Sequence, residues 1–348
     1  MRPGRNPPLA LGLVDDDRFD AHTARGVHPE RPERLAAARS GLRGAIAPEK
    51  VRAIDTRPVR ADELTAVHAP AYLETLREAL SRGWGSLDAD TFHSPGSEEA
   101  AWHAAGGAAE LATRVMQGEL TRGVALLRPP GHHAEADRAM GFCLLNNVAF
   151  AARAAQAAGA RRVAVIDWDV HHGNGTQHIF EADPDVLFVS LHQWPLYPGT
   201  GAAAETGVGP GEGATLNVPL PAGSGDEVYG AAFREVVLPA VEAHAPDVIL
   251  VSAGYDAHQR DPLASMELSS AAYGAMATSL VDLAESLGHG RVICLLEGGY
   301  DLRGLEESVA ATARALLGER TALPEGRVSP EARDALSEVL ERRSRPRR

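Results

Sequence analysis

The sequence predicts an α/β protein built on one mostly parallel β-sheet with helices on both faces. Short apolar runs alternate along the chain with longer, alanine-rich stretches that favour helix. This alternation is typical of a parallel sheet whose strands are connected by helices. Several of the apolar runs end in carboxylate, imidazole or phenol side chains, which is where open α/β sheets place their ligands.

The strands are predicted from apolar runs that have the length of a buried strand. Because both faces of a parallel sheet are covered, such strands need no alternation of polar and apolar residues. The clear candidates are Leu9–Val14, Gly123–Leu127, Arg162–Asp167, Val186–Leu191, Asp247–Ala253 and Arg291–Leu296, and the weaker ones are Val51–Asp55 and Thr215–Pro219.

The helices are predicted in the alanine-rich stretches between the strands. They are Pro32–Arg43, Ala71–Arg82, Ser97–Gln117, Asn147–Ala158, Asp226–His244, Ser270–Leu287 and Leu302–Leu317. One segment, Trp194–Gly213, is rich in Gly and Pro and lacks any periodicity. Long loops of this kind are uncommon unless they are functional, and this one follows a strand end, so we expect it at the rim of a site.

The chain is expected to fold as one domain. No change of composition and no flexible linker divides it before about residue 320, so we predict a domain over residues 1–320 and a helical, basic tail over residues 321–348. The stretch Ser329–Arg348 begins like a helix and ends in a run rich in Arg. A solvated, frayed end is a better interpretation of this run than a nucleic-acid-binding tail.

The net charge and the cysteine content of the chain indicate which partners and which cellular compartment to expect. A formal net charge of −13 argues against nucleic acid, which needs a basic surface. Cys143 and Cys294 provide no disulfide framework, and no signal peptide or membrane-length apolar run is evident. We therefore expect a cytoplasmic protein without a membrane partner, which could form a homo-oligomer through surfaces that the sequence does not locate.

A metal site is predicted where the run Arg162–Asp167 ends. Asp169 and His171 are two residues apart, so in an extended backbone they face the same way. For this pair alone a salt bridge is an equally good interpretation, but Asp256 follows another candidate strand, Asp247–Ala253, at a matching place. Three protein ligands with one open position are typical of catalytic zinc, although iron or cobalt could occupy the same ligand set.

The adjacent His132 and His133 follow the strand Gly123–Leu127 and a Pro-Pro-Gly turn. Two imidazoles near a metal site can act as general base and general acid, whereas the alternative is a pair of exposed loop histidines. Each needs a partner on its second nitrogen, and Asp167 and Asn174 are the candidates. Because one partner is a carboxylate and the other an amide, we expect the two imidazoles to differ in basicity.

Tyr300 follows Gly298 and Gly299 after the strand Arg291–Leu296. Glycines permit close approach of the backbone, so the phenol could reach the site and donate to an oxyanion. The alternative, a core tyrosine after a glycine turn, would be preferred if the other strand ends carried no polar groups.

Together these residues resemble the zinc-dependent histone deacetylase superfamily, and the best match is to its class II-like bacterial members, which include acetylpolyamine amidohydrolases and acetoin-utilisation proteins. The resemblance runs from His28 to Leu302, through the motifs Arg128-Pro-Pro-Gly-His-His-Ala134, Gly141-Phe-Cys-Leu-Leu-Asn-Asn147, Asp167-Trp-Asp-Val-His-His-Gly-Asn-Gly175, Tyr197-Pro-Gly-Thr-Gly201, Ser252-Ala-Gly-Tyr-Asp256 and Glu297-Gly-Gly-Tyr300. It implies the three-layer arginase/deacetylase fold and one catalytic zinc on Asp169, His171 and Asp256. It also implies His132 and His133 as the catalytic pair and Tyr300 as the carbonyl-polarising hydroxyl.

The resemblance implies further sites. A structural potassium ion would lie near the zinc loop, on Asp167, Asp169, His171, Ser190 and Leu191, and the acyl-lysine tunnel would be lined by Gly141, Phe142, Tyr197, Leu263 and Gly299. Leu263 stands where polyamine-selecting relatives carry an acidic residue. Gly173 stands where arginases carry a ligand to a second metal, so a single catalytic metal is expected.

Three functions follow, in order of preference. The first is a zinc amidohydrolase that removes acetyl or another small acyl group from lysine in proteins or peptides. The second is a deacetylase of acetylpolyamines or other small amides. The third is a non-catalytic module that binds acyl-lysine, against which the complete set of ligands and acid–base groups argues.

Overall fold

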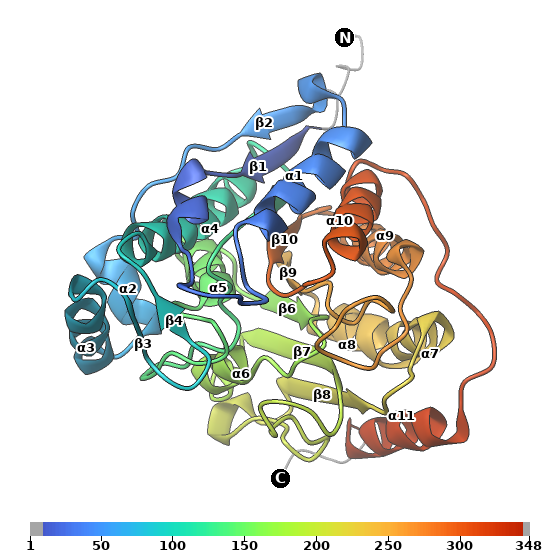
Figure 1. Cartoon of the computed structure of the whole chain (residues 1–348). Coiled ribbons are helices and arrows are strands. Elements are labelled where there is room, and N and C mark those ends of the chain that lie inside the picture. Colours follow the sequence, from blue (N-terminus) through green and yellow to red (C-terminus); the bar gives the residue numbers. More distant parts are fainter. Residues whose placement is uncertain (1–9, 344–348) are drawn as a thin grey trace.

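The computed structural model describes residues 10–343, and an eight-stranded parallel sheet forms its centre (Figure 1). Every pair of neighbouring strands in this sheet runs parallel. The strand order is β2-β1-β5-β10-β9-β6-β7-β8. The strands are β1 (Leu11–Val14), β2 (Val51–Ala53), β5 (Arg122–Ala125), β6 (Val163–Asp167), β7 (Val186–Gln193), β8 (Thr215–Leu220), β9 (Val248–Ala253) and β10 (Val292–Leu296).

All of the predicted strands are confirmed, with bounds that shift by a few residues. The two with the weaker signal, β2 and β8, are the edge strands of the sheet. Each has a single neighbouring strand, and two of the three residues of β2 are exposed, whereas β8 is almost fully buried. The first residue of the expected strand Leu9–Val14 lies outside the described part of the chain.

The helices pack in two groups that cover opposite faces of the sheet (Figure 1). One group is α1 (Glu33–Ala45), α7 (Asp226–Ala232), α8 (Leu238–His244), α9 (Ser270–Ser286) and α10 (Leu302–Leu316). The other is α2 (Ala61–Val67), α3 (Pro70–Ser81), α4 (Ser97–Met116), α5 (Asn147–Ala157) and α6 (Asn174–Phe180). The predicted three-layer fold is therefore confirmed.

The sequence did not predict α2, α6 or the small hairpin of β3 (Gly85–Ser86) and β4 (Phe92–His93). Both missed helices have seven residues, which is too short for a helical period to stand out. The predicted helix Asp226–His244 is continuous, but a π-helical turn over Phe233–Val237 separates α7 from α8.

The C-terminal helix α11 (Pro330–Arg343) packs on the edge strand β8. Its Ala332, Leu336 and Val339 are buried in the same hydrophobic core as the sheet. The start of this stretch is helical, as expected, and the apolar side of the helix covers a strand edge that would otherwise be open. The last basic residues, 344–348, lie outside the described part of the chain.

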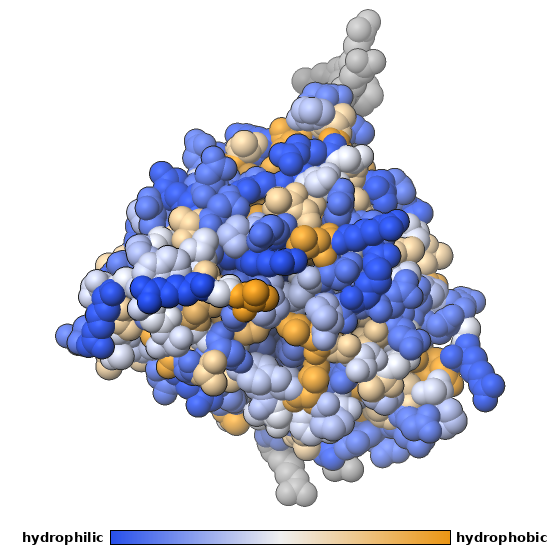
Figure 2. Space-filling view, in the orientation of Figure 1, coloured by the Kyte–Doolittle hydropathy of each residue, from blue (hydrophilic) through white to orange (hydrophobic). Residues whose placement is uncertain are grey.

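The order of the strands decides where the polar strand ends meet. β5, β10, β9 and β6 are consecutive neighbours at the centre of the sheet. Their registers align Leu296 with Ala253 and Asp167 with Ser252, so the residues that follow these strands leave the sheet at the same edge. The molecular face in Figure 2 is largely hydrophilic and carries only small apolar patches. Among residues 10–343, the helices are too short or too polar for a membrane span.

Candidate active site

Asp169, His171 and Asp256 come together just beyond the carboxyl ends of β6 and β9. His171 Nδ1 lies 3.0 Å from Asp169 Oδ1 and 3.3 Å from Asp256 Oδ2. Both carboxylates are buried, whereas His171 is partly exposed. Two buried carboxylates that face one imidazole require a positive charge between them, and either a proton on His171 or a metal ion can supply it.

The arrangement of these three residues fits a zinc ion. A tetrahedral site with zinc–ligand bonds of about 2.0 Å has ligand–ligand edges of about 3.3 Å, close to the two observed distances. Within the described residues, Asp256 Oδ2 is buried without a hydrogen-bond partner, so it has a free lone pair for a metal. The other carboxylate oxygens are oriented by backbone amides: Val170 N–H donates to Asp256 Oδ1 and Gly298 N–H donates to Asp169 Oδ2.

Gly173 leaves no room for a second metal ligand at its position. A Cβ atom added there would lie 2.1 Å from Asp167 Oδ2 and 3.2 Å from His132 Nδ1. Because even an alanine would collide with the carboxylate, this position excludes the extra ligand of a two-metal site. The steric reason was not visible in the sequence, where Gly173 counted only by comparison.

His132 and His133 lie side by side, with ring centroids 4.0 Å apart, and both are buried. His132 Nδ1 contacts Asp167 Oδ2 at 2.9 Å, and His133 Nδ1 contacts Asn174 Oδ1 at 2.7 Å. The structure therefore places one of the two candidate orienting residues on each histidine, and the contacts decide which residue holds which ring.

The two imidazoles differ in electrostatic environment. Burial by itself lowers the pKa of both side chains. Around His132, the carboxylates of Asp167 and Asp169 outweigh burial and raise its pKa above the usual value. His133 faces an amide and the neighbouring imidazoles instead, so its pKa is lowered. The two imidazoles therefore differ in basicity, as their unlike partners led us to expect.

Tyr300 stands on a strained turn next to the site. Gly299 has φ of +118°, a left-handed backbone that favours glycine. Asp261 accepts hydrogen bonds from the backbone N–H groups of Tyr300, at 2.6 Å, and Asp301. The guanidinium of Arg34 lies over the Tyr300 ring, 4.8 Å from its centroid, and donates to Gly299 O. Arg34 therefore holds the Tyr300 ring, and Asp261 holds its backbone.

Phe142 and Tyr197, two of the predicted tunnel residues, lie against the site. The Tyr197 ring is 5.1 Å from the His133 ring, and the Phe142 ring is 6.0 Å from the Tyr300 ring. Phe142 has φ of +69°, a rare conformation for a residue with a side chain, and such strain clusters at functional sites. Leu263 is partly buried two residues after Asp261, which accepts its backbone N–H.

The segment Trp194–Gly213 forms part of the site rim, as its place after β7 suggested. Glu205 accepts the backbone N–H groups of Gly201 and Ala202, and His192 contacts Gly201 O at 2.9 Å. His172 points away from the metal ligands toward Thr200 and Gln177. These contacts hold the loop that carries Tyr197 over His133.

Four residues with roles at the site were not singled out in the sequence: Arg34, Glu135, Asp261 and Glu297. Glu297 accepts the backbone N–H groups of Gly131 and His132, and burial raises its pKa to about 7. Glu297 lies within a motif of the resemblance, Arg34 lies shortly after His28, where the resemblance begins, and Glu135 lies two residues after His133. Their positions near the predicted site residues in the sequence could have marked them as candidates, but only the contacts in the structure show what each residue does.

His68 supports the backbone behind the histidine pair and makes acid stability testable. Its Nδ1 contacts Glu135 O at 2.8 Å, and Asn146 N–H donates to its Nε2 at 3.0 Å, so the ring must be neutral. Burial lowers its pKa to about 4, below the unfolded value of 6.5. Between these values the unfolded chain binds more protons, so this residue should reduce stability by about 3 kcal/mol as the pH falls from 6.5 to 4.

His68→Gln keeps one donor and one acceptor but does not titrate, so we expect a shallower loss of stability below pH 6.5. Urea unfolding between pH 4 and 7.5 would measure it, with the values above pH 7 as the control because both side chains are neutral there. Parallel pH curves for the two proteins would contradict the prediction.

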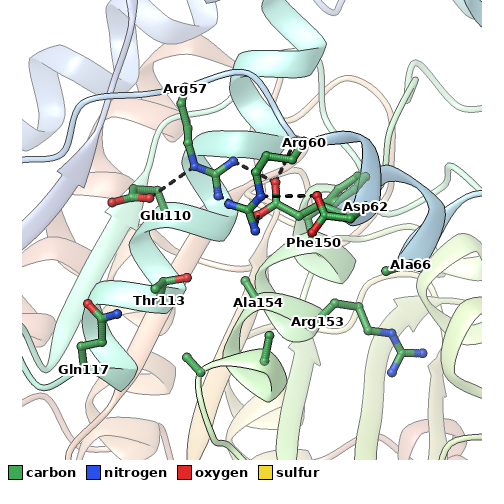
Figure 3. Close-up of a pocket in the computed structure, with 13 residues that line it drawn as sticks. Arg57, Arg60, Asp62, Ala66, Glu110, Thr113, Gln117, Phe150, Arg153 and Ala154 are labelled. Atoms are coloured by element: carbon green, nitrogen blue, oxygen red, sulfur yellow. Dashed lines mark hydrogen bonds and ion pairs between the residues drawn. The ribbon is translucent and has the colours of Figure 1, made fainter.

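Figure 3 shows a separate pocket of about 330 Å³ between α2, α4 and α5. Two arginines of its rim form ion pairs with carboxylates of the same pocket: Arg57 pairs with Glu63 and Glu110, and Arg60 pairs with Asp62 and Glu63. The pocket contains none of the predicted site residues. We therefore keep the candidate active site at the carboxyl edge of the sheet.

Comparison with known proteins gives a consistent result. The family model "Histone deacetylase domain" matches residues 28–316. Histone deacetylase 15 of Arabidopsis thaliana is 45% identical over 313 residues, which cover 87% of this chain and 56% of that protein. Polyamine deacetylase HDAC10 of Homo sapiens is 40% identical over 316 residues, which cover 86% of this chain and 46% of that protein. The match thus spans about half the length of both relatives. The crystal structure of the HDA15 HD domain superposes with a TM-score of 0.89 and 40% identity, and the match covers 96% of each chain.

Proposed function

The chain belongs to the histone deacetylase family, and from this premise we propose that it is a zinc-dependent amidohydrolase that removes acetyl or another small acyl group from lysine side chains. One observation carries the proposal: the candidate metal ligands lie at the same sheet edge as two adjacent histidines with unlike partners. Metal ligands alone would fit a structural site, but the histidine pair adds groups that can move protons.

The side chains divide the reaction among them. Asp169, His171 and Asp256 would hold a zinc ion, which would supply a Lewis acid to polarise the amide carbonyl and acidify water. His133, neutral and bonded through Nδ1 to Asn174, offers Nε2 as the base that takes a proton from the attacking water. His132 stays protonated against Asp167 and stabilises the negative charge that develops. Tyr300 donates its hydroxyl proton in a hydrogen bond to the carbonyl oxygen.

The remaining step breaks the C–N bond. The proton that His133 accepted passes to the departing nitrogen, so lysine leaves as a neutral amine and the acyl group leaves as a carboxylic acid. The acid then loses its proton to solvent and becomes a carboxylate, and the amine takes a proton from solvent. Phe142 and Tyr197 border the approach to the site, where they would exclude side chains bulkier than an acylated lysine.

The test is turnover of a fluorogenic acetyl-lysine peptide by protein with quantified metal content. We expect activity that rises with zinc occupancy, and parallel loading with iron and cobalt would identify the metal that supports it best. Absence of turnover at full zinc occupancy across peptides with several acyl groups would contradict the proposal and revive the binding-module alternative.

Deacetylation of polyamines is the second candidate, favoured by the similarity to a polyamine deacetylase. Leu263 argues against it, because an apolar side chain offers no partner to a second ammonium group. We expect kcat/KM for an acetyl-lysine peptide to exceed that for acetylspermidine. Leu263→Glu should shift this ratio toward acetylspermidine by about fivefold, the equivalent of an ion pair of about 1 kcal/mol. Leu263→Gln is the control, because Gln has the size of Glu but no charge. An equal shift in both variants would rule out a charge effect.

Two further proposals complete the function. A structural potassium ion would bind near Asp167 and Ser190, which the register of β6 and β7 places opposite one another, with Leu191 next to them. All of these residues are buried, so a bound cation would offset the charge of Asp167.

We also propose a cytoplasmic location, since Cys143 and Cys294 are both free.

A further inference from the structure

A buried carboxylate lies directly behind the amide that holds His133. Glu135 Oε1 accepts a hydrogen bond from Asn174 Nδ2 at 2.6 Å. The same oxygen contacts Arg138 Nη2 and His178 Nδ1, each at 2.9 Å. A continuous chain of hydrogen bonds therefore runs from the exposed His178 through Glu135 and Asn174 to His133.

The side-chain amide of Asn174 has two ends of opposite character. Its oxygen only accepts and its NH₂ group only donates, while a half-turn exchanges them with almost no change of shape. A carboxylate only accepts, so Glu135 must face the NH₂ group. The oxygen of Asn174 then faces His133 Nδ1, at the observed 2.7 Å.

This orientation selects the form of His133. An acceptor opposite Nδ1 requires the proton of the neutral imidazole to be on Nδ1, which leaves Nε2 free to accept a proton. With the amide turned round, its NH₂ group would face Nδ1, and the proton would move to Nε2. That tautomer cannot act as a base toward the reaction centre.

The surroundings keep Glu135 ionised and in place. Burial raises its pKa, but hydrogen bonds from His178, Arg138 and Asn174 outweigh burial and lower the pKa to about 2. Asn174 and His178 are one turn apart on α6, so the same helix presents both donors to the carboxylate. The charges of Glu181 and Arg138 also act on the His178 imidazole.

We propose that Glu135 is a positioning residue that fixes the orientation of the Asn174 amide and, through it, the catalytically competent tautomer of His133. The inference rests on the proposed deacetylase function, since it assigns His133 the role of base. It differs from a general structural role because it depends on the polarity of one amide and not on packing.

The test compares variants of the zinc-loaded enzyme that separate acceptor, shape and charge. Glu135→Met keeps the length of the side chain without an acceptor, and we expect kcat to fall by about 10- to 100-fold with KM within about twofold. Glu135→Gln retains an acceptor oxygen and should stay within about threefold of the parent. Arg138→Met, the matched control, removes a neighbouring ion pair but leaves the contact between Glu135 and Asn174.

A double variant distinguishes positioning from folding. Asn174→Asp gives His133 a partner whose two oxygens both accept, so no amide has to be oriented. In the Glu135→Met background it should therefore restore kcat to within about fivefold of the parent. In the presence of Glu135 it would place two carboxylates in contact, so the single variant should be less active than the double. A structural role for Glu135 predicts no such rescue.

A spectroscopic readout makes the test independent of turnover. In ¹⁵N-histidine NMR spectra, His133 should show Nδ1–H in the parent and a larger share of Nε2–H in Glu135→Met, with the signal assigned by loss in His133→Ala. Unchanged kcat and tautomer in Glu135→Met would overturn the inference, as would loss of activity that Asn174→Asp does not restore. An inactive parent would instead contradict the proposed function, while the tautomer would still report on Glu135.

Discussion

Replacement of Tyr300 by Phe is expected to lower kcat/KM for an acetyl-lysine peptide by about 100- to 1,000-fold, the usual cost of removing one donor to a developing oxyanion. The ring should keep its place, because Arg34 stacks on the aromatic face and Asp261 holds the backbone amide. Only the hydroxyl is lost. The effect should therefore appear in kcat, since the donor acts mainly when negative charge develops on the oxygen.

Tyr273→Phe is the matched control for this experiment. Tyr273 is fully buried, and within the described residues its hydroxyl has no hydrogen-bond partner. Its removal should leave kcat/KM within about twofold and zinc content unchanged. If Tyr300→Phe retained the activity of the parent, the phenol would have no part in the reaction, and the mechanism proposed for it would be wrong.

Replacement of Asp256 by Asn should reduce zinc affinity by about 100-fold or more. Loss of a residue that merely supports a ligand costs about 10- to 100-fold, so loss of a charged ligand should cost at least as much. The amide keeps the shape of the side chain and can still accept the hydrogen bond from Val170 N–H at Oδ1. With its oxygen at Oδ1, the amide places an NH₂ group where Oδ2 was, so the variant loses both the charge and the lone pair that would bind the metal.

Zinc competition with a chromogenic chelator measures the affinity, and peptide turnover at rising zinc concentration measures the consequence. We expect low turnover that excess zinc restores in part. Asp282→Asn is the control, because Asp282 lies in an exposed ion pair with Arg320, away from the ligands. Full zinc retention by Asp256→Asn would show that the metal binds elsewhere.

The candidate site residues could be predicted from the sequence because they lie at the ends of strands. Asp169, Asp256 and Tyr300 each follow an apolar run by a few residues, and parallel strands carry such residues to a common edge. The partners of the histidine pair were also predictable in kind, since each imidazole needs one group on its second nitrogen. The resemblance to a known family rested on these same residues and agrees with the fold.

The residues that escaped prediction act through contacts between distant parts of the chain. Arg34 reaches Tyr300 from helix α1, and Asp261 binds the Tyr300 backbone from a separate loop. Glu135 is close to His133 in sequence, yet its importance depends on Asn174, which comes from α6. No local sequence pattern predicts such contacts, because they depend on how the helices, strands and loops pack together.

The sequence by itself determined the class of fold, the strands, the candidate metal ligands and the acid–base pair, since periodicity and residue chemistry are local properties. Only the tertiary structure decided that β5, β10, β9 and β6 are adjacent, that α11 covers the β8 edge, and that Gly173 has no room for a side chain. It also decided the orientation of the Asn174 amide, whose oxygen faces His133 and whose NH₂ group faces Glu135. These features depend on distances between residues far apart in the chain, and only packing sets such distances.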